Sequence, residues 1–438
     1  MNITFPQALV GLYVLLTFLV GFFTPKERSE QGFLFASRRV TLPALVMTLV
    51  CTWYGGILEI GRYSYEHGIV TWVMFGMFYY LAAGIYALFI APKISSGYIG
   101  SIPELIEGSF GRGSAILAGL LLIFIASPAP YLKMLSTIID YLYGIGPQKA
   151  IILGALISMA YTIRGGFRSV LRTDIIQFSM MYVGFLSILI YLYMNYGGYS
   201  FLVKNLPPAS LSIPGNLSWG YLFSWGFIAL VTFIDPNFYH RSFAGSSDKD
   251  VKRGILISIL FWFLFDLISI TTGLYAAAII GDVKHSPFLD LASVALPPLL
   301  QGIFLLSMFS IIISTIDSFV FVSGLTIGRD LISAGLDKPD SIFYTKIGIV
   351  VSAIISVILA TFFENAIDIW YVSGSFGASV LLIPMLCCLY KKQVNHPLLL
   401  MLVPLLVTGG WFLLGYSSLD PLYPGILSSA VCYLLLRK

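Results

Sequence analysis

The chain has 438 residues, of which 58% are hydrophobic, 15% are aromatic and only 11% are charged. Charged side chains this scarce cannot cover the surface of a water-soluble protein, so the composition excludes an ordinary soluble enzyme and indicates a protein that uses lipid as its solvent. The formal net charge is only +4. We expect no nucleic-acid partner, because the basic residues gather between apolar runs as they do in membrane proteins.

The apolar residues form many runs of about 20, the length with which a helix crosses a hydrocarbon core of roughly 30 Å. No stretch alternates apolar and polar residues for long enough to indicate a barrel strand. The first run lacks a preceding basic residue and a following cleavage site, so we expect a retained helix rather than a signal peptide. The sequence predicts an all-α integral membrane protein with about thirteen transmembrane helices, at 4–23, 41–66, 68–92, 114–143, 147–163, 167–196, 218–239, 252–280, 298–328, 343–363, 366–390, 397–415 and 421–436.

Lysine and arginine accumulate in the cytoplasmic loops of membrane proteins. With the N-terminus outside, the inner segments hold most of the 25 basic residues, Arg241 and Lys338 among them. The exceptions are Arg62, Lys133, Lys149, Lys204 and Lys284. The charge pattern and the odd helix number therefore predict a multi-pass protein of the cell's inner (plasma) membrane, with the N-terminus outside and the C-terminus in the cytoplasm.

Two other classes of membrane protein find little support. An embedded enzyme would need a metal or nucleophile constellation, but the four histidines are scattered and the four cysteines lie in apolar runs without metal-ligand spacing. A receptor would need a signalling domain, and the short connections between the predicted helices leave no room for one. We therefore expect neither an enzyme nor a receptor.

Chemistry is expected where a predicted span carries a charge or a helix-breaking glycine, because lipid disfavours both. In the second span, Gly55 and Gly56 fall in mid-helix and Glu59 follows one turn later. A broken helix would free backbone carbonyls, hard oxygen ligands that suit Na⁺. Close packing of another helix explains the two glycines equally well. Asp266 is a further intramembrane acid, for which an interhelical hydrogen bond is the default expectation.

The ninth span carries Ser314, Thr315, Asp317 and Ser318 within about one turn. A lone hydroxyl in a membrane helix usually bonds to the carbonyl of residue i−4. A cluster around an acid is harder to explain in that way. Since Ile311 shares a helix face with three of these side chains, a carbonyl, hydroxyls and a carboxylate could converge on one cation.

A third segment, YTIRGGFRSVLRTDIIQ at 161–177, places Asp174 about a turn and a half inside a predicted helix. It follows almost throughout the Tyr-Thr-x-x-Gly-Gly-x-x-x-Val-x-x-Thr-Asp-x-x-Gln pattern of the sodium/solute symporter family, which includes proline, sialic acid and sugar cotransporters. CTWYGGILEIG at 51–61, DPNFYHR at 235–241 and ISTIDS at 313–318 agree with the family in place and order. The chain resembles this family over about residues 1–390.

The resemblance implies a LeuT-like core of two inverted repeats of five helices, with one extra helix before it and two after it. The expected units are an N-terminal helix and first cytoplasmic loop at 1–40, the repeats at 41–196 and 197–390, and two C-terminal helices at 391–438. The implied function is Na⁺-coupled symport of a small organic solute by alternating access. A proton-coupled or ion-uncoupled carrier of the same fold is the alternative. We expect a monomer whose partners are the solute and the lipid bilayer.

The resemblance also implies a Na⁺ site between the first and eighth core helices. Carried over by position, its ligands are the carbonyls of Cys51, Tyr54 and Ile311 and the hydroxyls of Ser314 and Thr315.

Asp317 departs from the family, which tends to have serine at this position, and it is expected to face Asp174. Together with Ser318, the two acids could bind a further cation or share a proton. Alternatively, they make separate structural contacts, for instance with a cytoplasmic arginine.

The solute is expected near the bilayer midplane, within reach of the broken first and sixth core helices. Lys133 is the leading polar candidate. If it faces the cavity, the solute should carry a carboxylate, as an amino acid, an organic acid or a sugar acid does, and Glu59 opposite would suit an amino acid. Otherwise Lys133 reaches outward or neutralises a nearby acid. Trp225 and Trp370 could stack on an apolar or sugar face, although most aromatic residues here are expected to pack or to anchor at the interface.

Overall fold

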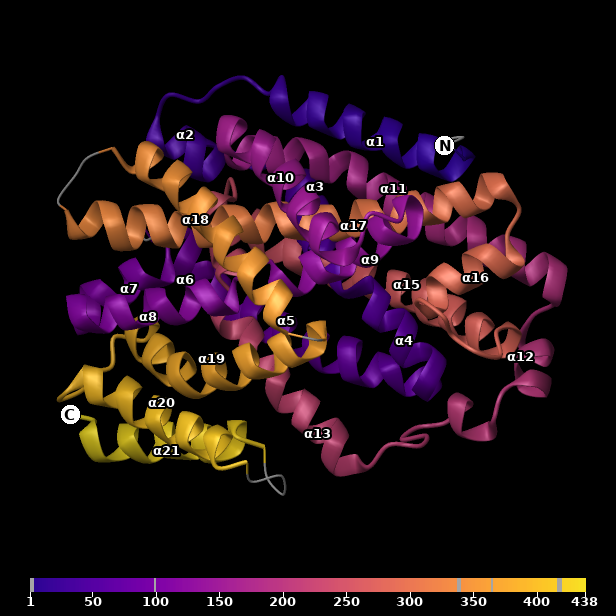
Figure 1. The fold of residues 1–438 in the computed structure, drawn as a ribbon. Coiled ribbons are helices and arrows are strands. Elements are labelled where there is room, and N and C mark those ends of the chain that lie inside the picture. The colour runs from indigo at the N-terminus through magenta and orange to yellow at the C-terminus, as the bar shows by residue number, and fades with distance from the viewer. Residues whose placement is uncertain (1–3, 98–99, 337–339, 364, 416–419) are drawn as a thin grey trace.

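The computed structural model describes residues 4–97, 100–336, 340–363, 365–415 and 420–438, and it is helical almost throughout these ranges (Figure 1). Within them, nine helical segments are long and apolar enough to cross a membrane, and two shorter apolar helices follow near the C-terminus. The predicted all-α membrane fold is therefore confirmed. The number of thirteen spans stays a prediction, because α10 and the interrupted pair α13–α14 are not among those segments. Lys338 lies outside the described residues.

The first half of the chain begins with one peripheral helix and a connection made of short helices, and longer helical segments follow. Its elements are α1 Phe5–Phe22, α2 Glu30–Phe35, η1 Ala36–Arg38, α3 Leu42–Trp53, η2 Tyr54–Gly56, α4 Ile57–His67, η3 Gly68–Val70, η4 Val73–Met77, α5 Phe78–Ile85, η5 Tyr86–Ile90, α6 Ala91–Ser95, α7 Ile102–Phe110, α8 Arg112–Ile125, α9 Ala129–Tyr143, α10 Pro147–Gly165 and α11 Phe167–Tyr196.

The second half repeats the pattern of an interrupted helix followed by longer ones, and two peripheral helices close it. Its elements are α12 Tyr199–Asn205, η6 Pro208–Leu211, α13 Trp219–Ile228, η7 Ala229–Ile234, α14 Pro236–Ala244, α15 Asp248–Ile279, α16 Pro287–Ala295, α17 Pro298–Leu325, η8 Thr326–Ser333, α18 Ser341–Phe362, α19 Ala366–Leu389, α20 Pro397–Leu413 and α21 Leu422–Leu436.

One predicted span is interrupted. The sequence predicts a continuous helix over 114–143, but α8 ends at Ile125 and α9 begins at Ala129. Pro128 and Pro130 lack the N–H groups that a continuous helix would use. The Ser127 hydroxyl instead accepts a hydrogen bond from the Ala129 amide at 3.3 Å. The first turn of α9, which includes Tyr131, is buried.

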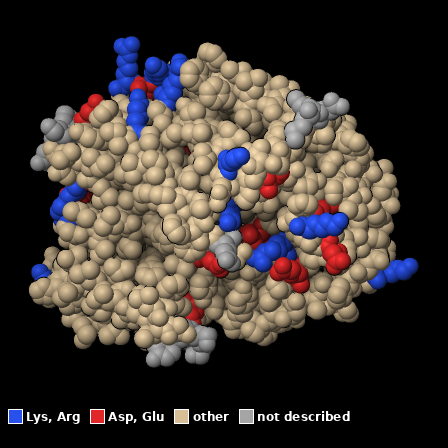
Figure 2. All heavy atoms as spheres, viewed as in Figure 1, with Lys and Arg blue, Asp and Glu red and all other residues tan. Residues whose placement is uncertain are grey.

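Helix α17 lies at the centre of the molecule, where it packs against α1, α3, α9, α11 and α18. In Figure 1, α1 runs along one edge, and α20 and α21 lie at the opposite edge. The outer helices expose large apolar side chains, including Leu12, Leu16 and Leu406. Most of the surface visible in Figure 2 carries no charge, as expected for a protein surrounded by lipid.

Candidate functional site

The first core helix changes geometry at the two glycines, where a short 3₁₀ segment, η2, separates α3 from α4. A Cβ atom on Gly55 would lie 2.6 Å from the Cβ of Thr315 on α17. A Cβ atom on Gly56 would lie 2.4 Å from the Trp370 ring on α19. Both interpretations of the glycine pair therefore apply, since the helix is irregular there and two neighbouring side chains pack directly on its backbone.

Three of the five proposed Na⁺ ligands meet at the Thr315 hydroxyl. This hydroxyl lies 3.2 Å from the carbonyl oxygen of Cys51, 3.2 Å from that of Thr52 and 3.3 Å from that of Ile311. A hydroxyl has one hydrogen, so it cannot satisfy three acceptors at once. The interrupted end of α3 and the middle of α17 thus present several oxygen atoms to one point.

The other two proposed ligands behave differently. The Ser314 hydroxyl donates to the Asp174 carboxylate at 2.6 Å, which directs it toward α11. The side chain of Tyr54 extends away from α17, and its hydroxyl donates to the carbonyl of Trp262 at 2.6 Å and to Asp266 at 3.0 Å. Only the backbone of Tyr54 belongs to the irregular segment beside Thr315.

The two acids of the possible second site have separate donors. Asp174 accepts hydrogen bonds from Ser314 and from Thr48, the latter at 2.5 Å. Asp317 accepts from Tyr161 and from Ser158, the latter at 2.5 Å. The contacts of Asp317 are thus with hydroxyl groups of α10, and no described arginine pairs with it.

Gln177 lies one turn after Asp174 on α11 and is fully buried. Neither its Oε1 nor its Nε2 has a hydrogen-bond partner among the described residues. A buried amide without partners is costly, so this orphan amide near Asp174 marks a place where a water molecule or an ion would be stabilised.

Arg241 is the main correction to the sequence prediction. The charge pattern of the sequence assigns Arg241 to a cytoplasmic segment, but the residue is 1% exposed and lies inside the protein. Its guanidinium donates to Thr48 at 3.1 Å, to Thr52 at 2.6 Å, to Ser318 at 2.7 Å and to Asn237 at 3.3 Å. Ser318 therefore contacts Arg241 and Thr52 rather than either of the two acids. The fork of donors joins α3, α14 and α17 into one polar network.

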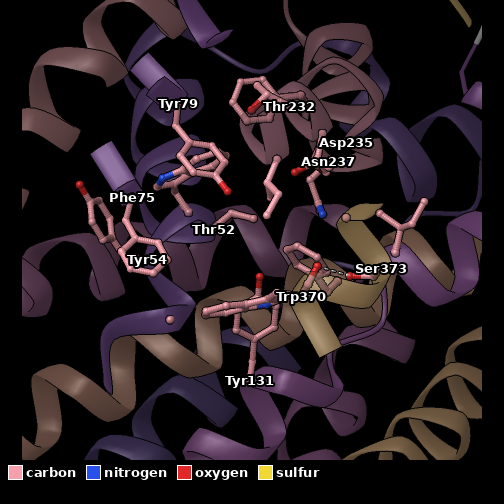
Figure 3. Close-up of a pocket in the computed structure, with 18 of the residues that line it drawn as sticks. Thr52, Tyr54, Phe75, Tyr79, Tyr131, Thr232, Asp235, Asn237, Trp370 and Ser373 are labelled. Carbon is pink, nitrogen blue, oxygen red and sulfur yellow. Dashed lines mark hydrogen bonds between the residues drawn. The ribbon is translucent and has the colours of Figure 1, made fainter. Parts of the chain in front are cut away.

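A cavity of about 170 Å³ opens beside this network, where the two interrupted helices face each other. Its wall combines residues of α3 and η2 with residues of η7 and α14. Nine of its 24 lining residues are aromatic. Figure 3 shows Tyr79 on one side, Tyr131 and Trp370 on the opposite side, and Asp235 with Asn237 along a third.

Two of the four candidate solute residues line this cavity. Trp225 and Trp370 do so, and the Trp370 ring lies 5.7 Å from that of Tyr131. Glu59 instead pairs with Arg62 at 2.7 Å. Lys133 donates to the carbonyls of Ala360 and Phe363, at 3.4 and 3.1 Å, so it caps the end of α18 instead of facing the cavity. Lys133 therefore gives no reason to expect a carboxylate on the solute.

Three polar residues of the cavity wall have no solute-binding role in the sequence prediction. Asp235 and Asn237 begin α14, and the Asp-Pro step after an apolar run is the pattern that could have identified them. Asp266 makes interhelical hydrogen bonds, as expected, to Tyr54 and Tyr80. Its place in the cavity wall could not be read from the sequence, because it depends on the rotation of α15.

The chain is similar to known transporters. The sequence profile of the sodium:solute symporter family matches residues 33–401. The chain is 27% identical over 408 residues to the sodium/pantothenate symporter of Haemophilus influenzae, covering 84% of this chain and 82% of that one. It is 24% identical over 358 residues to the high-affinity proline transporter of Bacillus subtilis, covering 74% of each. A solved structure of a Na⁺-coupled sialic acid symporter superposes with a TM-score of 0.83 at 18% identity, covering 99% of this chain and 98% of that one.

Proposed function

Because the chain belongs to the sodium:solute symporter family, we propose that it carries a small organic solute across the membrane together with Na⁺. The family consists of transporters, so the protein is a secondary transporter and not an enzyme. Its fold suits alternating access, in which a central site opens first to one side of the membrane and then to the other.

The convergence of oxygen atoms on Thr315 carries the sodium proposal. The proposed ligands are the carbonyls of Cys51, Tyr54 and Ile311 and the hydroxyls of Ser314 and Thr315. Carbonyl and hydroxyl oxygens are hard ligands that suit a small, non-redox cation. A cation at this point would bind α3 and α17 at once and would thereby hold the interrupted helix against the centre of the molecule.

A second ion or a proton is proposed for the region of Asp174, Asp317 and Ser318. Two buried carboxylates on neighbouring helices, with the unpaired amide of Gln177 close by, support this proposal. Carboxylates that interact strongly titrate as a pair, so a shared proton and a bound cation are alternative ways of neutralising them. A proton-coupled or ion-uncoupled carrier of the same fold remains the second candidate function.

Coupling requires that the ion and the solute stabilise the same conformation, so each raises the apparent affinity of the other. In the proposed orientation, with the N-terminus outside and the C-terminus in the cytoplasm of the plasma membrane, the negative interior drives Na⁺ inward. Moving one charge through 100 mV supplies about 2.3 kcal/mol. We propose a monomer as the working unit, because the cavity lies within one chain.

The relatives transport proline and pantothenate, as their names state, and the cavity of this chain suits a solute of small size. At roughly 30 Å³ per water molecule, it holds the equivalent of about six waters. An amino acid is therefore a proposed solute class.

The direct test uses the purified protein in proteoliposomes with radiolabelled solutes. Uptake should require an inward Na⁺ gradient, and replacing Na⁺ by K⁺ at equal ionic strength should abolish it. Uptake driven by a proton gradient in K⁺ would favour the alternative, and uptake independent of both gradients would contradict ion coupling. Thermal unfolding of the solute-free protein in Na⁺ and in K⁺ tests sodium binding separately.

A further inference from the structure

The interior of the protein holds more negative than positive side chains. Asp174, Asp235, Asp266 and Asp317 lie in or beside the central network and cavity, together with a single guanidinium, that of Arg241. Among the described residues, none of the four carboxylates has a cationic nitrogen within 4.0 Å. A buried carboxylate without a counter-charge is costly, so the interior requires further positive charge from ions, protons or the solute.

Three of these acids have an identifiable source of positive charge. Asp174 and Asp317 belong to the proposed ion region, and Thr48 links Asp174 to Arg241. Asp235 caps the start of α14, where it accepts from the Asn237 amide at 2.7 Å and faces the positive end of the helix dipole. Arg241 and the helix dipole thus offset the charge of Asp174 and Asp235, whereas Asp317 depends on the ion or proton proposed for its region.

Asp266 has no such source. It is 2% exposed, and its hydrogen bonds come from the hydroxyls of Tyr54 and Tyr80, which are neutral donors. It also lines the cavity. Of the two acids that line the cavity, Asp235 lies at a helix N-terminus, and Asp266 has neutral hydroxyl donors alone among the described residues.

The rest of the wall favours a cation over an anion. Aromatic faces such as those of Tyr79, Tyr131 and Trp370 attract positive groups through the ring quadrupole. No lysine stands among the described lining residues, and the guanidinium of Arg241 is already bonded to four acceptors. An anionic solute would therefore find little positive charge free to receive it.

We propose that the cavity takes a solute with a positively charged nitrogen, an ammonium or quaternary ammonium group, and that Asp266 is its counter-charge. The proposal rests on the proposed function, since it names the class of solute carried. Two buried lining groups without partners, Thr232 Oγ1 and Asn237 Nδ2, suit hydrogen bonds to the polar remainder of such a solute. Amino acids belong to this class through their ammonium group.

The same carboxylate is positioned to link the solute to Na⁺. Tyr54 contributes its hydroxyl to Asp266, while its backbone lies in the irregular segment beside the proposed Na⁺ site. A positive group at Asp266 would hold Tyr54 in place and thereby keep η2 in the geometry that Na⁺ requires. Solute affinity should therefore be higher in Na⁺ than in K⁺.

The test uses thermal unfolding and equilibrium binding of the purified full chain, with two matched pairs of probes. One pair is choline and its neutral tert-butyl analogue, and the other is proline and cyclopentanecarboxylate, which lacks the nitrogen. In saturating Na⁺, we expect a nitrogen-bearing probe to raise the unfolding temperature and its matched partner to leave it unchanged. Equal binding of the two members of a pair, or no binding of either nitrogen-bearing probe, would overturn the proposal.

The variant Asp266→Asn keeps the size of the side chain and removes its charge. We expect it to bind the nitrogen-bearing probe roughly 10- to 100-fold more weakly. The matched control is Asp140→Asn, whose carboxylate accepts from the Gly146 amide outside the cavity. Unchanged affinity in Asp266→Asn would contradict the proposal. If this variant does not fold, the binding of the matched probe pairs to the parent protein still tests the proposal. Failure of Na⁺ to stabilise the parent protein would instead contradict the proposed function.

Discussion

The hydroxyl of Thr315 on α17 lies 3.2 Å from the carbonyl oxygen of Cys51 on α3. This contact joins the most central helix of the molecule to the last regular turn before η2. The methyl-bearing side of the same residue packs on Gly55, where a Cβ atom would come within 2.6 Å. One side chain therefore holds the two helices together through both a polar and a van der Waals contact.

Replacing Thr315 by valine keeps this packing and removes the hydroxyl. We expect the apparent affinity for Na⁺ to fall by at least about tenfold, because one of the proposed oxygen ligands is lost. The measurement is the Na⁺ dependence of uptake in proteoliposomes. Thr361→Val is the matched control, since the hydroxyl of this exposed residue bonds only the carbonyl of Val357. Identical Na⁺ dependence in the two variants would show that Thr315 is not a ligand.

Substitutions of Asp317 test whether this acid takes part in ion coupling or only in structural contacts. If it holds a second cation or a proton with Asp174, Asp317→Ser and Asp317→Asn should each reduce the charge moved per solute, because one neutralising ion is no longer needed. The measurement is the reversal potential of solute-driven current. If both variants move the same charge as the parent, the contacts of Asp317 with Ser158 and Tyr161 are purely structural.

Gly55→Ala adds a methyl group where Thr315 and Tyr131 leave no space for it. Overpacking of this kind costs about 1–3 kcal/mol, so we expect a lower unfolding temperature and loss of transport. Gly108→Ala is the control, because no described atom outside the local backbone of α7 lies within 4 Å of a Cβ added to this exposed glycine. That change should be neutral or slightly stabilising. Equal unfolding temperatures for the two variants would contradict the packing described for Gly55.

Arg241→Lys tests the polar network. Lysine keeps the charge but cannot reproduce the fork that reaches Thr48, Thr52 and Ser318. We expect the free energy of unfolding to fall by about 1–3 kcal/mol, because buried hydroxyl groups are left without partners. The measurement is the unfolding temperature, which should be lower. Arg253→Lys on the exposed start of α15 should leave this temperature unchanged. A parent-like unfolding temperature in Arg241→Lys would mean that the network adds little to stability.

The proposed orientation predicts which ends of α15 can be labelled. In a Cys432→Ser background, which removes the one cysteine that is not buried, Lys249→Cys should react with a membrane-impermeant maleimide only after the cells are opened. Lys284→Cys, in an exposed loop beyond the far end of the same helix, should react in intact cells. The reverse pattern would place the N-terminus in the cytoplasm.

Much of the fold could be predicted because the hydropathy of a span is a local property. Long apolar runs require helices in lipid, and Gly55 and Gly56 mark a place where one of these helices could break or be closely packed. The region of Asp174 and Ser314 could also be located, because both lie in segments with a recognisable pattern, and the structure joins them by a hydrogen bond of 2.6 Å.

The solute cavity could not be predicted in the same way. Each residue turns the helix surface by about 100°, so the direction of one side chain depends on how the whole helix packs. Packing directs Lys133 to the end of α18, away from the cavity. It also buries Arg241, which the charge pattern had assigned to a cytoplasmic loop.

The sequence by itself therefore determined that this protein is embedded in lipid, because composition and the length of the apolar runs decide that property. It marked Gly55 and Gly56 as a place where the first core helix could break, and the Na⁺ ligands stay a proposal that rests on the family resemblance. Only the tertiary structure decided which charges face the cavity, since that depends on contacts between helices far apart in the chain. Asp266 shows the difference. Its burial was predictable from the apolar run around it, but its lack of a cationic partner follows from the arrangement of α15 against α3 and α5.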